Sequence, residues 1–165
     1  MYKFSLIAIL LLFGCSKLFS QPADLGVGAV GLVVSDLKKS QEFYTDVIGM
    51  KEVGGFELSA EWAQEAGMSD NRPFAVKIFK MRETNTATML KLAYFDEVKS
   101  SEKMKAIGQS AGVNYITFYL NELRGVKERI KNANITVIGE VERDAYTLII
   151  VQDPDGVFVE LIELR

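Results

Sequence analysis

The sequence predicts an α+β fold made of two tandem βαβββ modules, which form a mixed, mostly antiparallel curled sheet around one cleft. The first observation is that one strand, one helix and three further strands can be traced twice along the chain. The second is the ratio of one helix to four strands, which suits a curled sheet better than a doubly wound layer. The third is that the two halves align with each other. The first module is expected at 26–95 and the second at 112–165.

The first module begins with an apolar strand and an amphipathic helix. Strands are expected at 27–34, 50–58, 74–82 and 86–95. The helix at 35–49 has Ser35 or Asp36 as its cap, and its buried stripe follows spacings of three and four: Leu37, Ser40, Phe43, Tyr44, Val47 and Ile48. We therefore interpret Phe43 and Tyr44 as packing residues. A short helical insertion at 59–68 contains Trp62, the single tryptophan, and could act as a lid over the cleft or cap the sheet.

The second module repeats this order after a polar linker at 96–112. Strands are expected at 112–120, 135–142, 145–152 and 156–164. The helix at 121–133 is expected to be capped by Asn121, and Asn134 stands where a left-handed residue usually ends a helix. The letters "DPDG", residues 153–156, are typical of a type I turn before the last strand.

The alignment of the two halves can be checked residue by residue. The segment "VSDL" at 34–37 falls on "LNEL" at 120–123 with an offset of 86, and Val53-Gly54 falls on Ile138-Gly139 with an offset of 85. One deletion inside the second helix explains the difference. The chain is therefore predicted to be an internal repeat of one supersecondary unit.

The first 20 residues predict export. They contain Lys3 and an apolar run at 4–13, which is far shorter than the roughly 20 residues that a spanning helix needs. Lipoprotein-type cleavage before Cys15, in "LFGC", and ordinary cleavage after Ser20 are both open. Either route predicts an extracytoplasmic protein that is periplasmic, lipid-anchored or secreted. Membrane contact is expected only through a lipid anchor at Cys15.

Composition excludes several classes of site. The chain has 19 Lys and Arg against 22 Asp and Glu, and loss of Lys3 and Lys17 with the signal would change the net charge from −3 to −5. A basic nucleic-acid-binding surface is therefore not expected. Cys15 is the single cysteine and there is no histidine, so no intrachain disulfide can form and the commonest metal ligand is missing. The mature length suits one compact domain.

Two segments resemble a known family. "GLVVSDLKKSQEFYTDVIGM" is similar to the opening of the vicinal oxygen chelate superfamily, and "DPDGVFVELIEL" is similar to its closing strand. That superfamily includes lactoylglutathione lyase (glyoxalase), bleomycin and fosfomycin resistance proteins and extradiol dioxygenases. The resemblance covers nearly all of residues 26–165 and implies a glyoxalase-like domain. It leaves the activity open, because one scaffold carries several chemistries.

The resemblance also implies four positions that would hold a metal, two in each module. They fall on Ala29, Lys91, Tyr115 and Glu160. A divalent transition metal needs about three or four N, O or S donors. Ala29 has none, Lys91 adds a competing positive charge, and Tyr115 would have to lose a proton from a pKa near 10. No metal and no other cofactor is therefore predicted.

Lys91 and Glu160 are repeat-related positions, so we expect them to face one cleft and to form an ion pair or a water-bridged contact. Strand alternation adds Tyr115, Thr117, Tyr119 and Phe158 to the predicted cleft. These residues would make a mostly apolar pocket with a few polar groups, which is typical of a small-molecule site. The same residues could instead fill a closed barrel.

Three functions remain open. The leading hypothesis is an exported protein that binds a small anionic or aromatic molecule without a metal. The alternative is a glyoxalase-type lyase or isomerase, or a dioxygenase, which would use Glu160 as base or residual ligand and Lys91 or Tyr115 as electrophilic partner. The third is a homodimeric scaffold that pairs through exposed strands and has lost its site.

Overall fold

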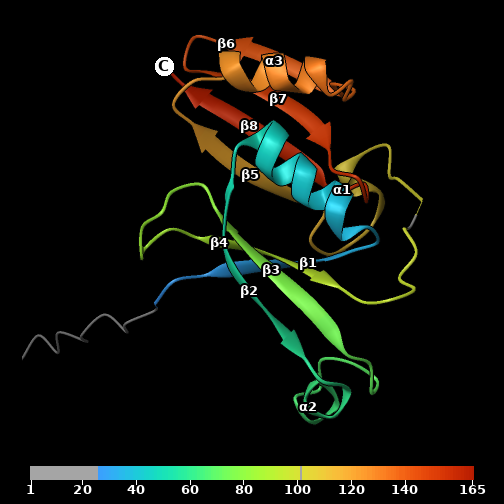
Figure 1. Ribbon diagram of the computed structural model, residues 1–165. Helices are drawn as coiled ribbons and strands as arrows, with labels where there is room; N and C mark the ends of the chain where they lie inside the picture. Colours follow the sequence, from blue (N-terminus) through green and yellow to red (C-terminus); the bar gives the residue numbers. More distant parts are fainter. Residues whose placement is uncertain (1–25, 101) are drawn as a thin grey trace, which may run out of the picture.

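The computed structural model describes residues 26–100 and 102–165. The predicted signal at 1–20, with Cys15, lies outside the described residues. Two four-stranded sheets carry the fold (Figure 1). In spatial order the first contains β1 (Ala29–Val34), β4 (Met89–Tyr94), β3 (Phe74–Lys80) and β2 (Lys51–Leu58). The second contains β5 (Tyr115–Leu120), β8 (Phe158–Leu164), β7 (Tyr146–Gln152) and β6 (Gly139–Arg143).

The two sheets have the same topology, which confirms the predicted repeat. In each sheet the first strand of the module pairs in parallel with the last, and the other neighbours are antiparallel. The register repeats as well, because Ala29 is opposite Met89 and Tyr115 is opposite Phe158. The predicted mixed, mostly antiparallel α+β class is confirmed. The sheets remain two separate sheets and do not close into one barrel.

Within the described part of the chain, five short helical segments connect the strands. They are α1 (Leu37–Glu42), η1 (Phe43–Ile48), α2 (Ala60–Glu65), η2 (Ile107–Gln109) and α3 (Arg124–Asn132). The predicted first helix is continuous in the chain but changes its winding, because η1 is a π-helix. Asp36 caps α1 by accepting a hydrogen bond from the backbone N–H of Lys39, as predicted.

The N-cap predicted for α3, Asn121, is wrong, whereas the residue predicted to end the helix, Asn134, is confirmed. The first residue outside the helix is Leu123, and its backbone N–H donates to Glu163 Oε2 of β8 at 2.7 Å. A carboxylate from a neighbouring strand therefore replaces the expected Asn121. Asn134 has a φ of 54° after the last turn, which confirms its left-handed conformation.

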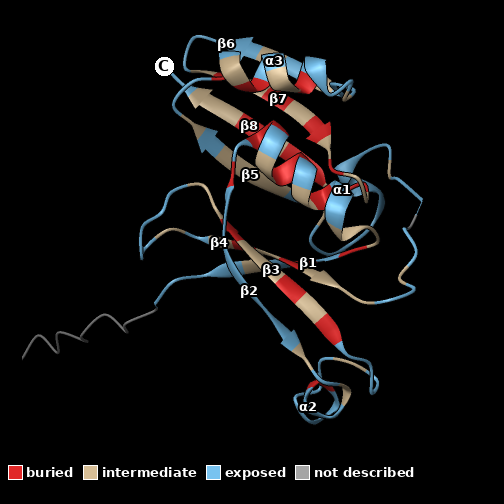
Figure 2. Cartoon of the chain, viewed as in Figure 1, coloured by how far each residue is buried: buried red, intermediate tan, exposed pale blue. Residues whose placement is uncertain are grey.

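One hydrophobic core joins the two modules. The helices α1 and η1 lie between β4 of the first sheet and α3 of the second module (Figure 1). Buried residues alternate with half-buried ones on β3 and β7 (Figure 2). The core draws on both halves: Leu32, Val34, Phe43, Tyr44, Val47, Ile48, Phe79, Leu90 and Leu92 from the first, Leu123, Val126, Ile130, Ile149, Val151, Val159 and Leu161 from the second. Burial of Phe43 and Tyr44 confirms their interpretation as packing residues.

The insertion at α2 covers one end of the first sheet, far from the second sheet (Figure 1). Ala63 is buried against Phe74 and Val76 of β3, so the helix caps the sheet at this end. Trp62 on the same helix is 50% exposed. None of the helices in the described residues is long and apolar enough to cross a membrane.

Candidate functional site

The four family ligand positions lie on the sheet faces that are turned away from the shared core. On β1, Leu32 and Val34 are buried, whereas Val33 between them is 56% exposed. Ala29 lies four residues before Val33, so both side chains are on the same face of β1. The register places Lys91 beside Gly31, which is on that face too. In the second sheet the corresponding pair is Thr117 beside Glu160. The repeat therefore positions Lys91 and Glu160 equivalently in their own sheets.

Glu160 is held by a hydrogen bond within its sheet. The hydroxyl of Thr117 donates to Glu160 Oε2 at 2.5 Å, and the carboxylate is partly buried. Tyr115 and Tyr119 flank Thr117 on the same face of β5, with exposed fractions of 51% and 67%. The hydrogen bond from Thr117 lowers the free-energy cost of placing the Glu160 carboxylate among apolar side chains.

Lys91 does not pair with Glu160 directly. Its Nζ lies 6.0 Å from the ring centroid of Phe56 on β2, which is a cation–π contact. Phe56 is two strands away from β4 within the first sheet, so the lysine side chain turns along its own sheet rather than toward the second. Among the described residues, no ion pair joins Lys91 to Glu160. The predicted direct pair is therefore not formed in the chain, because the two charges belong to separate sheets.

The four family positions do not fit a divalent metal. Ala29 has no donor atom, Lys91 contributes a cation, and the Glu160 carboxylate is already bonded to Thr117. Within residues 26–100 and 102–165 no group of three or more His, Cys, Asp or Glu side chains comes close enough to hold a metal ion. The chemistry available at these positions is therefore that of one carboxylate, one ammonium and one phenol.

A groove of about 610 Å³ lies where the first sheet meets β5, and we call it the tyrosine groove. It is lined by Val30, Met50, Met81, Arg82, Ala87, Thr88, Met89, Leu90, Val113, Tyr115, Ile116, Thr117, Phe118 and Tyr119. Three predicted cleft residues, Tyr115, Thr117 and Tyr119, are therefore brought together in it. Glu160 reaches it only through Thr117, and Lys91 does not line it. Phe158, which lies beside Tyr115 in the register, does not line it either, and its side chain is 2% exposed.

One cation and three methionines of the tyrosine groove were not predicted from the sequence. Arg82 is the one charged residue among the groove's lining residues, and Met50, Met81 and Met89 supply flexible apolar surface. Arg82 lies two residues after the end of β3, and its backbone carbonyl accepts from the backbone N–H of Thr84 in a tight turn. Its position beside β5 depends on how the modules meet, and the pattern within each module does not contain that information.

Polar contacts also join the two modules to each other. Tyr44 of η1 donates its hydroxyl hydrogen bond to Asp153 Oδ2 at 2.9 Å, inside the core. Ser35 donates its backbone N–H to Asp155 Oδ2 at 3.0 Å, and its hydroxyl also bonds that carboxylate. From the other side, Arg129 of α3 donates to the carbonyl of Val47 at 2.8 Å. These contacts hold β5 and β8 in a defined position relative to β1 and β4.

The turn at 153–156 has a second role that was not predicted. Gly156 N–H donates to the carbonyl of Asp153 at 3.1 Å, which confirms the predicted turn. The Asp153 side chain also accepts from the backbone N–H groups of Asp155 and Val157, and it is 1% exposed. Burial raises the pKa of Asp153 above its ordinary value of 3.8, although these hydrogen bonds oppose the shift. Burial, together with the charge of Asp153, raises the pKa of Tyr44 well above 10.0, so Tyr44 remains a donor.

Comparisons with solved structures agree with this architecture. The glyoxalase family protein from Bacillus cereus superposes with a TM-score of 0.67 at 19% identity, over 88% of this chain and 97% of that one. A glyoxylase/bleomycin resistance protein/dioxygenase domain from Frankia sp. EAN1pec gives 0.63 at 17% identity, over 85% and 98%. The trypanothione-dependent glyoxalase I of Leishmania major gives 0.62 at 21%, over 82% and 84%. At these identities the likeness concerns the fold.

No curated protein sequence matches the chain significantly. The model of one protein family, however, matches residues 26–161, which include both modules and all eight strands except the last residues of β8. The chain therefore belongs to the Glyoxalase/Bleomycin resistance protein/Dioxygenase superfamily.

Proposed function

We propose that the protein binds a small, mostly apolar anion in the tyrosine groove without the help of a metal. The observation that carries this proposal is the lining itself. Tyr115 and Tyr119 offer aromatic surface, three methionines offer adaptable apolar surface, and Arg82 is the single charge. A volume of about 610 Å³ falls within the range of small-molecule sites, roughly 300–1,000 Å³.

Arg82 selects the charge of the ligand in this proposal. Its guanidinium presents a planar fork of donors that matches a carboxylate, and it stays charged at any physiological pH. The backbone carbonyl of Arg82 accepts a hydrogen bond within the turn. The side chain is exposed, so its guanidinium is accessible to a ligand. Lys91, which the sequence suggested for this role, is engaged with Phe56 instead.

We also propose that the protein works outside the cytoplasm. This proposal is supported by the N-terminal sequence alone, namely the apolar run at 4–13 after Lys3 and the small residue before Cys15. Fractionation of cells that express the chain tests it, with Cys15→Ser as the variant. The variant should lose membrane association if Cys15 is lipidated, and recovery of the wild-type protein in the cytoplasm would refute export.

Ligand-induced thermal stabilisation tests the binding proposal. The protein is treated with EDTA and titrated with 2-naphthoate, and the melting temperature is measured. A ligand that binds only the folded state stabilises it by about 2.7 kcal/mol at one hundred times its Kd. We expect the melting temperature to rise with concentration, and Arg82→Met to reduce the rise.

Arg124→Met is the matched control, because Arg124 is an exposed arginine on α3 that does not line the tyrosine groove. It should respond to 2-naphthoate like the wild type. Equal responses from Arg82→Met and Arg124→Met would refute the role of Arg82. A response that appears only after Zn²⁺, Ni²⁺ or Mn²⁺ is added would refute metal independence.

An enzymatic alternative rests on Glu160. Two solved relatives are named as glyoxalase I, from Leishmania major and Zea mays. In this chain the Thr117 hydroxyl orients the Glu160 carboxylate beside the tyrosine groove, so Glu160 could serve as a general base. If the protein is an enzyme, Glu160→Gln should abolish turnover of a glyoxalase-type substrate while 2-naphthoate still binds. Activity that survives in Glu160→Gln would exclude this alternative.

A further inference from the structure

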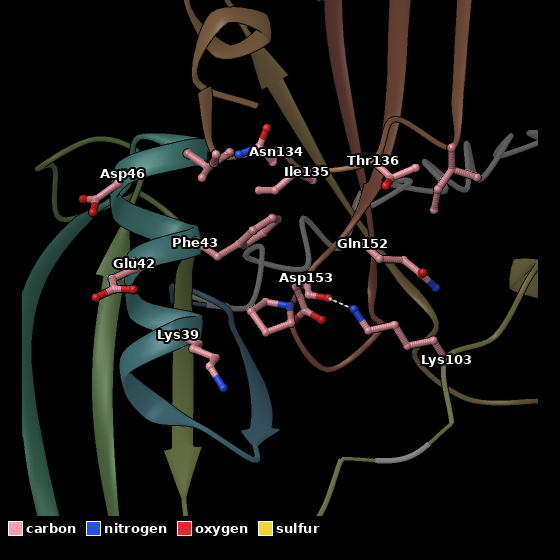
Figure 3. Close-up of a pocket in the computed structure, with 14 residues that line it drawn as sticks. Lys39, Glu42, Phe43, Asp46, Lys103, Asn134, Ile135, Thr136, Gln152 and Asp153 are labelled. Carbon is pink, nitrogen blue, oxygen red and sulfur yellow. Dashed lines mark hydrogen bonds between the residues drawn. The ribbon is translucent and has the colours of Figure 1, made fainter. Parts of the chain in front are cut away.

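A second cavity of about 700 Å³ lies on the helix side of the molecule, and we call it the helix pocket (Figure 3). It is lined by Lys39, Glu42, Phe43, Asp46, Val47, Lys103, Ala133, Asn134, Ile135, Thr136, Ile138, Gln152, Asp153 and Pro154. None of these residues lines the tyrosine groove. The helix pocket is built from α1 and η1, from the linker, and from the ends of α3 and β7, so both modules contribute.

The body of the helix pocket is apolar. Phe43 and Val47, four residues apart on η1, form one wall, and each is 5% exposed. Ile135 and Ile138 belong to the connection after α3, and Ile138 is 46% exposed. Figure 3 shows the Phe43 ring and Ile135 on the same side of the cavity, above Asp153. A compact apolar group that covered Ile138 and touched Phe43 would remove this surface from water, which favours binding.

Charges of both signs line the helix pocket: Lys39 and Lys103 are cations, and Glu42, Asp46 and Asp153 are carboxylates. In Figure 3 the carboxylates of Glu42 and Asp46 point away from Phe43, whereas Lys103 reaches toward Asp153 from the linker. Lys103 Nζ donates to the backbone carbonyl of Asp153 at 3.3 Å. An ammonium has three donors, so this long bond leaves Lys103 able to bond an anion as well. Lys39 is a second cation on the wall, paired at 3.1 Å with Asp36 in an exposed ion pair.

The carboxylate at the bottom of the helix pocket is already satisfied. Asp153 accepts from Tyr44 and from the backbone N–H groups of Asp155 and Val157. These three donors come from inside the protein, so the buried carboxylate is bound internally rather than offered to a ligand. A ligand at this place therefore meets lysine donors at one end and apolar side chains at the other.

We infer that the helix pocket is a second ligand site, for a small monocarboxylate with a compact apolar body. The carboxylate would bond Lys103, with Lys39 adding attraction, and the body would lie against Phe43, Ile135 and Ile138. Because the walls come from both modules, an occupied pocket would connect them at the same place as the Tyr44–Asp153 hydrogen bond. This inference is independent of the tyrosine groove.

Methyl NMR distinguishes the two sites in one titration. The full chain, labelled at isoleucine and methionine methyl groups, is titrated with phenylacetate. Ile135 and Ile138 report the helix pocket, whereas Met81 and Met89 report the tyrosine groove. We expect saturable shifts at Ile135 and Ile138. Lys103→Met should raise the Kd at these methyl groups by about three- to tenfold, the effect of losing one charge-assisted hydrogen bond at a partly exposed site.

Lys105→Met is the matched control, because Lys105 is an exposed lysine of the same linker that does not line the helix pocket. It should leave the Kd unchanged. Neutral phenylacetamide should bind more weakly than phenylacetate. The inference is wrong if Ile135 and Ile138 show no saturable shift, if they shift equally with phenylacetamide, or if Lys103→Met binds like Lys105→Met. Shifts confined to Met81 and Met89 would also overturn it while supporting the tyrosine groove.

Discussion

At the scale of single residues, Asp153 best shows how one side chain serves both local and long-range structure. It closes the turn before β8 through two backbone N–H groups and accepts the hydroxyl of Tyr44, which is 109 positions earlier in the chain. The turn was predictable because its residue pattern is local. The partner was not, because Tyr44 is one of several apolar residues on its helix and nothing in its spacing identifies Asp153.

Asp153 predicts a specific pH dependence. Burial raises its pKa in the folded state above 3.8, so the folded chain binds this proton at a higher pH than the unfolded chain. The group's contribution to stability is therefore fully present below 3.8 and is lost as the pH rises through the raised pKa. Asp153→Asn cannot titrate, so the wild type should lose stability relative to this variant as the pH rises.

Urea unfolding at several pH values between about 4 and 7 measures this difference as changes in the free energy of unfolding. Asp144→Asn, in the exposed turn between β6 and β7, controls for the loss of one surface carboxylate. A difference between wild type and Asp153→Asn that stays constant with pH would contradict the account.

The candidate site was only partly predictable for the same reason. Tyr115, Thr117 and Tyr119 follow from strand alternation, and Thr117 lies beside Glu160 because the repeat fixes the register. Arg82 could not be found, because its place in the tyrosine groove depends on the contact between modules. Lys91 and Glu160 were expected to meet, but their alignment in the repeat does not determine the distance between the two sheets.

At the scale of elements, most helices and strands could be predicted because hydrophobic periodicity is a local property. The π-helical winding of η1 could not. The helix ends at Gly49, which has a φ of 94° and donates to the carbonyl of Tyr44, and Met50 donates to the same carbonyl. Both of these bonds go to one carbonyl, and the carbonyls of Val47 and Ile48 in the last turn accept from the Arg129 side chain instead.

Gly49→Ala should therefore destabilise the protein by about 1–2 kcal/mol, because L side chains avoid this backbone conformation. A methyl group at Gly49 would also lie 3.1 Å from Arg129 Nη2, whose guanidinium bonds the carbonyls of Val47 and Ile48. Gly139→Ala is the control, since its backbone is ordinary and nothing lies within 4 Å of the added methyl group. Chemical denaturation compares the two, and equal stabilities would refute the role of Gly49.

The start of α3 gives a second prediction at this scale. Glu163 accepts the backbone N–H of Leu123, so Glu163→Ala should lower the free energy of unfolding by about 0.5–2 kcal/mol, as for the loss of a helix cap. Glu128→Ala, on the exposed face of the same helix, should change stability little. The assignment of Glu163 as the cap fails if both variants are equally stable in thermal and urea denaturation.

At the scale of the whole molecule, the two modules are similar in topology but do not form independent cores. The principal core contains residues of both, and Tyr44 and Arg129 bond across the boundary. We therefore expect one cooperative unfolding transition, with equal calorimetric and van't Hoff enthalpies. Two resolved calorimetric transitions would show that the modules unfold separately and that these contacts contribute little.

The shared core also explains where ligands can bind. Modules that meet through helices and strand edges leave spaces at the junction, and both the tyrosine groove and the helix pocket lie there. The arrangement of the two sheets provides this junction, and Ala29, Lys91, Tyr115 and Glu160 do not make a suitable donor set for a divalent metal. Recognition is therefore proposed to depend on aromatic and methionine surface with one cation.

The most direct test of metal-independent binding in the tyrosine groove is a calorimetric titration of the EDTA-treated protein with 2-naphthoate, accompanied by metal analysis of the purified sample. We expect saturable binding by the metal-free protein, a higher Kd for Arg82→Met and an unchanged Kd for Arg124→Met. Stoichiometric bound Zn, Ni, Mn or Fe, with binding lost when the metal is removed, would contradict metal-independent binding.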